Sequence, residues 1–310
     1  MARKKKAPAV VVTGISGRLG RLLTKKLHRK FPVIGIDRRP FERAPKDVEM
    51  HRFDIRSRRC EEIFRRNEVE AVIHLNIMHN PRRSPRETHE FNIMGTRQML
   101  EYCARYDIPK FILLSTANVY GTGPRNMQYL REDAPLMGAA TDSRIRHLIE
   151  TDMLCTAFFW QHPEVETVVL RPVHICGSVR NAASNYLRLS RIPKLLGFDP
   201  VVQVIHEEDV VDAILKTLLP GARGVFNVTG PEPVPLSALL NEVNKPIVEV
   251  PHLLFEPVVS RMYKARVWGF PPAELEHLKY GCMVNGSRLR EELAYTPQYG
   301  LRDIGALFSS

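Results

Sequence analysis

Three glycines spaced three residues apart are the feature of this chain that most directly indicates chemistry. Gly14, Gly17 and Gly20 follow the apolar run 9–12 and open the amphipathic stretch 18–30. A strand, a glycine turn and a helix in this order form a cradle for the pyrophosphate of a dinucleotide, because the turn lets the backbone approach the phosphates and the helix N-terminus is positive. We therefore predict that the chain binds a dinucleotide here.

A carboxylate stands where such a cradle needs one. The second apolar run, residues 32–37, ends in Asp37. An acid at this place accepts hydrogen bonds from the adenosine ribose and repels a 2′-phosphate, which favours NAD. Arg38 and Arg39 directly after it could attract that phosphate. We predict NAD and leave NADP as the alternative.

The elements that must position these residues alternate through the first half of the chain. Strands are predicted at residues 9–12, 32–37, 50–55, 71–75, 110–115 and 167–171, and helices at 18–30, 58–67, 85–106 and 142–161. This alternation predicts an α/β fold, a Rossmann-type doubly wound parallel sheet that binds its ligand at the carboxyl ends of the strands.

The second half of the chain follows a looser pattern. Beyond Pro172 prolines are more frequent and periodic segments shorter. We predict an NAD(P)-binding Rossmann domain over residues 1–175 and a smaller C-terminal substrate lobe over residues 176–310. Residues 201–219 have the pattern of a strand and a helix that return to the Rossmann domain, so the two parts would be interleaved.

The charge balance indicates anionic partners. The formal net charge is +11 and arginine clusters dominate it. An anionic small-molecule substrate, an acidic membrane surface or nucleic acid would be attracted, whereas solvated helix faces account equally well for any single cluster. Aromatic residues do not alternate with the basic ones as in an RNA-binding platform, so nucleic acid is the less favoured partner.

The sequence lacks the patterns of a membrane segment, a signal peptide and a metal site. No apolar run reaches the roughly 18 residues of a transmembrane segment, and no signal-peptide pattern follows the basic start, so we expect a cytoplasmic protein. The five cysteines lack C-x-x-C spacing. They indicate neither a disulfide framework nor a zinc site, and no metal is predicted.

Beyond the glycine turn, the motifs resemble those of the extended short-chain dehydrogenase/reductase family, which includes NAD-dependent sugar-nucleotide epimerases and dehydratases. The matching segments are Asp54-Ile55, Ile73-His74-Leu75-Asn76, Phe91-Asn92-Ile93-Met94-Gly95-Thr96, Ser115-Thr116-Ala117-Asn118-Val119-Tyr120-Gly121, Leu170-Arg171-Pro172-Val173, His206-Glu207-Glu208-Asp209-Val210 and Phe226-Asn227-Val228-Thr229-Gly230. They span nearly the whole chain in the family's order.

The resemblance implies a homodimer and a set of cofactor contacts. The implied cofactor-binding residues are Gly14, Ser16, Gly17, Arg18, Leu19, Gly20, Asp37, Arg38, Asp54, Ile55, Leu75, Asn76, Asn92 and Arg146. It also places Thr116 at the family's catalytic Ser or Thr, where a hydroxyl would bind a substrate oxygen. The alternative is a hydroxyl that only caps the end of the strand.

The chain departs from the family at the Tyr-x-x-x-Lys motif. Asp142 occupies the tyrosine position and Arg146 the lysine position. An ionised carboxylate cannot donate a proton and is a far weaker base than a tyrosinate, whereas Arg146 keeps a positive charge for a ribose. Asp142 could instead cap the helix or pair with Arg146. Tyr129 and His147 are substitute acids supported by proximity alone.

Substrate contacts are indicated more weakly. Arg82 follows the fourth strand, and Arg180 and Asn181 follow a Cys-Gly-Ser turn. With Arg83 and Arg188, these arginines could bind a diphosphate through bidentate contacts, although exposure without function is the better explanation for any one of them.

Two functions receive almost equal support from the sequence. The first is an NAD(P)-binding oxidoreductase or epimerase that acts on a nucleotide-sugar or related anionic substrate through a non-standard acid/base. The second is a catalytically inactive protein that senses nucleotide state. Binding of RNA or an acidic membrane through the arginine-rich surface is a third and minor hypothesis.

Overall fold

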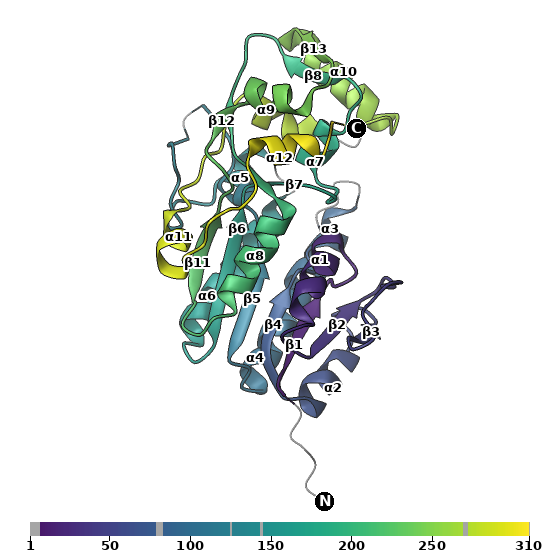
Figure 1. The fold of residues 1–310 in the computed structure, drawn as a ribbon, viewed down its shortest axis with the longest axis vertical. Coiled ribbons are helices and arrows are strands. Elements are labelled where there is room, and N and C mark those ends of the chain that lie inside the picture. Colours follow the sequence, from purple (N-terminus) through teal and green to yellow (C-terminus); the bar gives the residue numbers. More distant parts are fainter. Residues whose placement is uncertain (1–6, 79–82, 125, 143–144, 269–271, 310) are drawn as a thin grey trace, which may run out of the picture. The chain divides into compact units, whose positions relative to one another are not determined.

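The computed structural model describes residues 7–78, 83–124, 126–142, 145–268 and 272–309. The chain divides into two compact units (Figure 1). Unit 1 comprises the residues up to Ser115 together with His147–Leu170 and Val211–Phe226. Unit 2 comprises Thr116–Arg146, Arg171–Val210 and the residues from Asn227 onward.

Unit 1 is built on a seven-stranded sheet in the order β11-β6-β5-β4-β1-β2-β3. The strands are β1 (Ala9–Thr13), β2 (Val33–Asp37), β3 (Glu49–Arg52), β4 (Val69–His74), β5 (Lys110–Leu114), β6 (Glu166–Pro172) and β11 (Gly224–Val228). β1 pairs in parallel with β2 and β4, and the pairs β2–β3, β4–β5 and β5–β6 are also parallel. The predicted Rossmann-type parallel sheet is therefore confirmed.

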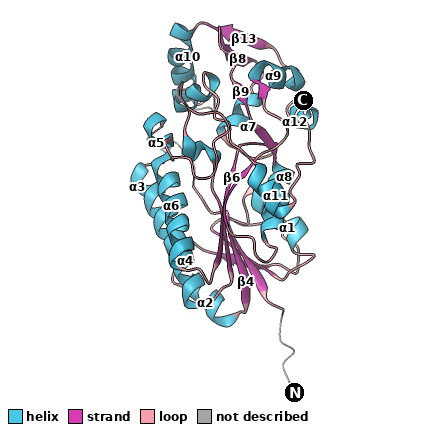
Figure 2. Cartoon of the chain, turned by 90° about the vertical axis from the view of Figure 1, so that its left-hand side faces the viewer, coloured by secondary structure: helices cyan, strands magenta, loops and turns pink. Residues whose placement is uncertain are grey.

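Helices cover both faces of this sheet. They are α1 (Arg18–Leu27), α2 (Arg59–Arg66), α3 (Pro85–His89), the π-helical turn η1 (Glu90–Met94), α4 (Gly95–Arg105), α6 (Arg146–Gln161) and α8 (Glu207–Thr217). Figure 2 shows α2, α4 and α6 on one face and α1 and α8 on the other. The strand order reverses between β1 and β4, and in such sheets ligands bind at the carboxyl ends of the strands on either side of that reversal.

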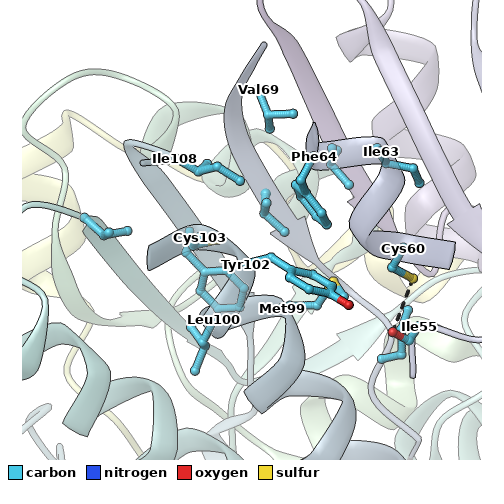
Figure 3. Packing of buried hydrophobic residues seen from close by; sticks show 14 of the residues in the cluster. Ile55, Cys60, Ile63, Phe64, Val69, Met99, Leu100, Tyr102, Cys103 and Ile108 are labelled. Carbon is cyan, nitrogen blue, oxygen red and sulfur yellow. Dashed lines mark hydrogen bonds between the residues drawn. The ribbon is translucent and has the colours of Figure 1, made fainter. Parts of the chain in front are cut away.

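The core of unit 1 holds the buried cysteines among aliphatic and aromatic side chains (Figure 3). The Cys60 thiol donates a hydrogen bond to the carbonyl of Ile55 at 3.3 Å. Burial and, secondarily, the charge of Asp54 raise the pKa of Cys60 to about 12, and burial raises the pKa of Cys103 still further. These cysteines are neutral thiols that fill the core.

Unit 2 has shorter elements. Its strands are β7 (His174–Cys176), β8 (Ile192–Leu195), β9 (Val201–Val202), β10 (Val204–His206), β12 (Val234–Pro235) and β13 (Ile247–Val250), in three two-stranded sheets: β10–β7 and β13–β8, which are parallel, and β12–β9, which is antiparallel. Its helices are η2 (Ala117–Tyr120), α5 (Gly138–Thr141), α7 (Ala182–Leu187), α9 (Leu236–Val243), α10 (His252–Lys264), η4 (Pro272–Leu278), α11 (Ser287–Leu293) and α12 (Leu301–Ala306). Aliphatic and aromatic side chains of α7, α9, α10 and η4 contribute to its core.

Two sequence predictions differ from these elements. The helix predicted from residue 142 begins only at Arg146, because Asp142 has extended backbone angles, φ −132° and ψ 103°. The domains predicted with a boundary at residue 175 are not the two compact units, since residues 116–146 group with unit 2 and residues 211–226 with unit 1. No helix of the described residues is long and apolar enough to cross a membrane.

Candidate cofactor and active site

The glycine turn after β1 leaves no room for side chains. Gly14 has a positive φ of 74°, and a Cβ atom there would lie 2.9 Å from the backbone nitrogen of Asn76 after β4. A Cβ at Gly20 would lie 2.6 Å from the carbonyl oxygens of Gly14 and Ile15, so only glycine lets α1 pack this closely on the turn. The turn thus brings the carboxyl ends of β1 and β4 together.

The N-terminus of α1 has the properties of an anion site. Gly17 is its N-cap residue, no side chain among the described residues caps it, and its first turn contains no acid. The first amides of a helix without such a cap remain oriented toward a ligand, and the helix dipole favours negative charge there. The predicted residues Arg18 and Leu19 lie in this first turn. The chain therefore has a backbone cradle that fits a pyrophosphate.

Asp37 connects the end of β2 to this cradle. It is 3% exposed, and its carboxylate accepts a hydrogen bond from the backbone nitrogen of Ser16 at 3.1 Å. The backbone nitrogen of Arg39 donates to the same carboxylate at 2.9 Å, and the Arg39 guanidinium lies 3.4 Å from it. A carboxylate offers about four lone-pair positions, so these contacts leave acceptor capacity for ribose hydroxyls.

The neighbouring arginine, Arg38, does not form an ion pair with Asp37 but lies against Asp54 and Phe91. The Arg38 guanidinium lies 3.7 Å from Asp54 and 4.7 Å from the centre of the Phe91 ring. Arg56 pairs with Asp54 at 2.9 Å and also lies over Phe91. Burial acts to raise the pKa of Asp54, but the hydrogen bonds and charge of Arg56 outweigh it, and the pKa lies below its usual value. Next to Asp54, Ile55 is fully buried and contacts Gly95.

A neutral histidine lies beneath the cradle. His74 at the end of β4 is fully buried between two hydroxyls: its Nδ1 is 2.7 Å from Thr13 Oγ1 and its Nε2 is 3.0 Å from Thr96 Oγ1. Burial lowers the pKa of His74 to about 3. The ring therefore stays uncharged at neutral pH and links β1, β4 and α4.

Asn92 holds the loop that follows β4. Its side chain is fully buried in the π-helical turn, where Oδ1 accepts from the backbone nitrogen of Met78 at 2.7 Å and Nδ2 donates to the carbonyl of Met78 at 2.9 Å. Leu75 and Asn76 lie directly before this loop and are partly buried. Asn92 thus fixes the backbone at Met78, next to the predicted cofactor-binding residues Leu75 and Asn76.

A hydroxyl and a buried carboxylate meet at the end of β5. Ser115 Oγ donates a hydrogen bond to Oδ2 of Asp152 on α6 at 2.6 Å, and Asp152 is fully buried. β5 pairs with β4 so that Leu113 lies opposite His74, which puts Ser115 level with Asn76 at the carboxyl edge of the sheet. Sequence analysis missed this pair.

The helical periodicity of residues 146–161 indicates that Asp152 is buried. Asp152 lies three residues after Ile149 and three before Cys155, both buried, so it occupies the inward face of α6. A carboxylate on a buried helix face is uncommon without a partner, and that partner could have been sought among the strand ends.

The three predicted catalytic residues belong to unit 2. Thr116 Oγ1 accepts a hydrogen bond from the backbone nitrogen of Asn118 at 3.2 Å and caps η2, so the capping role considered from the sequence is present. Asp142 precedes α6 and its carbonyl accepts from the Ile145 nitrogen at 3.1 Å. Arg146 is the exposed first residue of the helix. Their roles in catalysis and ribose binding stay predictions.

A polar network in unit 2 explains several of the family motifs. Buried Arg171 donates from Nη1 to Tyr120 Oη at 2.8 Å and to the carbonyl of Glu132 at 3.0 Å. Tyr120 Oη donates to Asn227 Oδ1 at 2.8 Å, and the Asn227 nitrogen donates to Glu132 Oε1 at 2.9 Å. These motif residues therefore fix the loop between η2 and α5.

The predicted substrate residues have mixed positions. Arg82 lies outside the described residues. Arg180 is exposed, whereas Asn181 caps α7 by accepting from the Ser184 nitrogen at 2.8 Å. Arg188 donates to the carbonyls of Gly177 and Val179, so it stabilises the turn before α7.

The chain matches a known protein family and is similar in sequence to several proteins. The model of the NAD dependent epimerase/dehydratase family matches residues 10–229. An uncharacterised protein of Mycobacterium tuberculosis (strain ATCC 25618 / H37Rv) is 25% identical over 301 residues, 94% of this chain and 80% of that protein. The dTDP-D-glucose 4,6-dehydratase of Dictyostelium discoideum is 39% identical over 66 residues, 20% of this chain and 15% of that protein.

Solved structures share the fold over almost the whole chain. The UDP-glucose-4-epimerase of Stenotrophomonas maltophila, solved with bound NAD and formylated UDP-arabinopyranose, has a TM-score of 0.76 at 16% identity and covers 97% of both chains. The UDP-glucuronic acid 4-epimerase of Bacillus cereus, solved with UDP-glucuronic acid and NAD, has a TM-score of 0.75 at 18% identity, with 97% of this chain and 98% of that chain covered.

Proposed function

The chain belongs to the NAD dependent epimerase/dehydratase family, and from this membership we propose that it binds NAD and acts on a nucleotide-sugar or a related anionic substrate. The observation that carries the proposal is the glycine cradle at α1 with Asp37 beside it. The epimerases with the same fold that were solved with NAD and a nucleotide-sugar support this choice of ligands.

NAD is favoured over NADP by the residues around Asp37. The carboxylate is buried at the end of β2, and an acid there repels a 2′-phosphate. The Arg38 guanidinium is held by Asp54 and Phe91, and Arg39 by Asp37 itself. Both arginines that could have attracted the phosphate are therefore already engaged.

The proton transfer of the reaction is assigned to Ser115 and Asp152. NAD, when bound, supplies the hydride acceptor for oxidation of a substrate alcohol. As Ser115 Oγ accepts the proton of that alcohol, it passes its own proton along the 2.6 Å hydrogen bond to Asp152 Oδ2. This relay takes the place of the tyrosine that the chain lacks at position 142, and Thr116 would bind the substrate oxygen.

The proposal is tested by calorimetric titration of nucleotide-stripped protein with NAD and NADP, followed by nicotinamide absorbance measurements across a panel of sugar nucleotides. We expect tighter binding of NAD than of NADP, and a change in absorbance with at least one sugar nucleotide. A Gly17→Asp variant, whose carboxylate would face the pyrophosphate, should bind neither nucleotide. If the unmodified protein also binds neither, the cofactor proposal fails.

A non-catalytic role is the second candidate. Arg146 is exposed and Asp142 lies before the helix, so the usual tyrosine–lysine arrangement is missing from α6. A sensor would bind NAD as an enzyme does but show no substrate-dependent absorbance change. Introducing Asp142→Tyr together with Arg146→Lys should then leave its cellular role unchanged, whereas loss of that role would argue for native chemistry.

We also propose a homodimer in the cytoplasm. Met153 and Trp160 lie seven residues apart on α6, with Ala157 between them, and are 57% and 76% exposed. A helix stripe of this kind on a soluble protein fits contact with a second copy. The buried thiols are consistent with a reducing compartment. Light scattering of the unmodified protein and of Trp160→Glu tests the dimer.

A further inference from the structure

Helix α10 carries apolar side chains on two opposite faces. Phe255 and Val259, one turn apart, are buried in the core of unit 2. On the other side Leu253 is 86% exposed and Leu254 is 57% exposed. A surface helix normally presents polar residues to water. Two adjacent exposed leucines at the start of α10 therefore indicate a face that binds something.

The exposed apolar surface continues onto neighbouring segments. Ile247 and Val248 of β13 are 38% and 41% exposed, and Leu196, directly after β8, is 50% exposed. The Leu196 nitrogen donates to the carbonyl of Val250 at 3.0 Å, two residues before α10 begins. Figure 1 shows β8, β13 and α10 next to one another. We call the surface formed by Leu196, Ile247, Val248, Leu253 and Leu254 the α10 face.

Basic side chains extend the outer side of the helix beyond the leucines. Arg261 lies seven residues, about two turns, after Leu254, and Lys264 lies eleven residues, about three turns, after Leu253, so both share the outward side. Arg266 follows just beyond the end of the helix. All three are exposed, and none forms an ion pair within the part of the chain that the structure describes.

Several arginines of unit 1 differ in this respect, because they form ion pairs. Their pairs include Arg56–Asp54 at 2.9 Å, Arg66–Glu62 at 3.1 Å and Arg83–Glu87 at 2.9 Å. Each of these three arginines thus has an acidic partner, which Arg261, Lys264 and Arg266 lack among the described residues. Near the α10 face, the exposed acids Glu249 and Glu256 are outnumbered by the exposed basic residues Arg261, Lys264 and Arg266. Apolar side chains beside uncompensated positive charge complement one kind of partner, an anionic lipid surface.

We propose that the α10 face docks the protein on an anionic lipid bilayer. The leucines enter the boundary between headgroups and acyl chains, while Arg261 and Lys264 reach lipid headgroups with their long side chains. A second copy is a poorer occupant of this face, because a symmetric contact would bring Arg261 and Lys264 of one copy close to the same residues of the other. The proposal involves unit 2 alone and does not depend on cofactor binding.

The test is co-sedimentation of the full-length protein with lipid vesicles. One set contains phosphatidylcholine alone and the other an equal mixture of phosphatidylcholine and phosphatidylglycerol. We expect binding to the mixed vesicles that weakens as sodium chloride is raised, and little binding to phosphatidylcholine. The double variant Leu253→Gln, Leu254→Gln should partition at least about tenfold less, because buried hydrocarbon is lost. The double variant Arg261→Gln, Lys264→Gln should lose the salt-sensitive part of the binding.

A matched control removes a similar amount of exposed apolar surface elsewhere. Met127 and Leu219 are 78% and 52% exposed and lie outside the α10 face. Met127→Gln together with Leu219→Gln should bind the vesicles like the unmodified protein. Circular dichroism spectra that match the unmodified protein show that each variant is folded.

Three results would overturn the proposal. The first is no sedimentation of the unmodified protein with anionic vesicles. The second is binding that survives both α10 double variants, which would assign it to the arginines of unit 1. The third is an oligomer that the leucine variant dissociates while vesicle binding persists, which would make the α10 face a contact between copies of the chain.

Discussion

The Ser115 hydroxyl donates a hydrogen bond to Asp152 Oδ2 over 2.6 Å, and this carboxylate is fully buried on helix α6. A buried carboxylate is retained only where its hydrogen bonds offset the cost of desolvation. The pair stands level with Asn76 at the edge of the sheet where the glycine cradle lies. A serine and a carboxylate in this position can move a proton without a tyrosine.

We predict that Asp152→Asn lowers kcat by about two to three orders of magnitude, because an amide cannot accept the proton that Ser115 passes on. The affinity for NAD, measured by calorimetry, should change little, since Asp152 is not part of the cradle. Ser115→Ala should lower kcat similarly, and the double variant should be no slower than either single one. Additive losses would show that the two residues do not act as a unit.

Gly20 offers a steric test of the cradle. Gly20→Ala should destabilise the protein by about 1–3 kcal/mol and abolish NAD binding, because its Cβ would lie 2.6 Å from the carbonyls of Gly14 and Ile15. Urea unfolding measures the free energy and calorimetry the binding. Gly123→Ala is the matched control, since among the described residues a Cβ there meets only Asn126 Oδ1, at 3.7 Å. Equal effects of the two substitutions would rule out the steric explanation.

Cofactor choice should depend on Asp37. In Asp37→Asn the repulsion of a 2′-phosphate is removed and Arg39 loses its charge partner, so we expect the ratio of NADP to NAD affinity to rise at least about tenfold. Calorimetric titration with both nucleotides gives this ratio. Adding Arg39→Gln should reverse most of the gain. An unchanged ratio in Asp37→Asn would mean that the ribose lies elsewhere.

His74 should make stability dependent on pH. Its pKa is about 3 when folded and near 6.5 in the unfolded chain, so the unfolded state binds the extra proton between these values. The contribution is complete above pH 6.5 and is lost as the pH falls, by about 1.4 kcal/mol per pH unit. Between pH 6.5 and 5 the free energy of unfolding should fall by about 2 kcal/mol more than in His74→Gln. Parallel urea titrations of the two proteins measure this difference.

The stability of the protein should depend on the Tyr120 hydroxyl, which joins Arg171 to Asn227 in the polar network of unit 2. Tyr120→Phe removes the bond that Arg171 donates and the one that Asn227 accepts, and both partners are buried. We expect a loss of about 2–3 kcal/mol in unfolding free energy, since two buried hydrogen bonds are lost and one of them involves a charged group. Tyr129→Phe is the control, because Tyr129 is 52% exposed. A loss no larger than that of the control would contradict the structural role.

The amino-acid sequence by itself determined the order of strands and helices, the parallel sheet and the cradle. The apolar runs and the three glycines are local signals. A strand, the turn after it and the next helix are each specified by residues that are close in the sequence. The identity of Asp37 as the acid at the end of β2 followed from the same local order. The start of α6 was predicted wrongly, because periodicity does not show that Asp142 adopts an extended backbone.

Only the tertiary structure decided which distant side chains meet. Ser115 and Asp152 are separated by 37 residues, and Tyr120 and Asn227 by 107. Sheet pairing and helix packing bring such residues within hydrogen-bond distance. The number of residues between them in the sequence does not indicate which ones will meet. The same holds for Asn92 and Arg188, whose side chains form hydrogen bonds to the backbone of nearby loops that the sequence did not indicate. A side chain's chemistry is a property of the residue, whereas its partner depends on how the chain is folded.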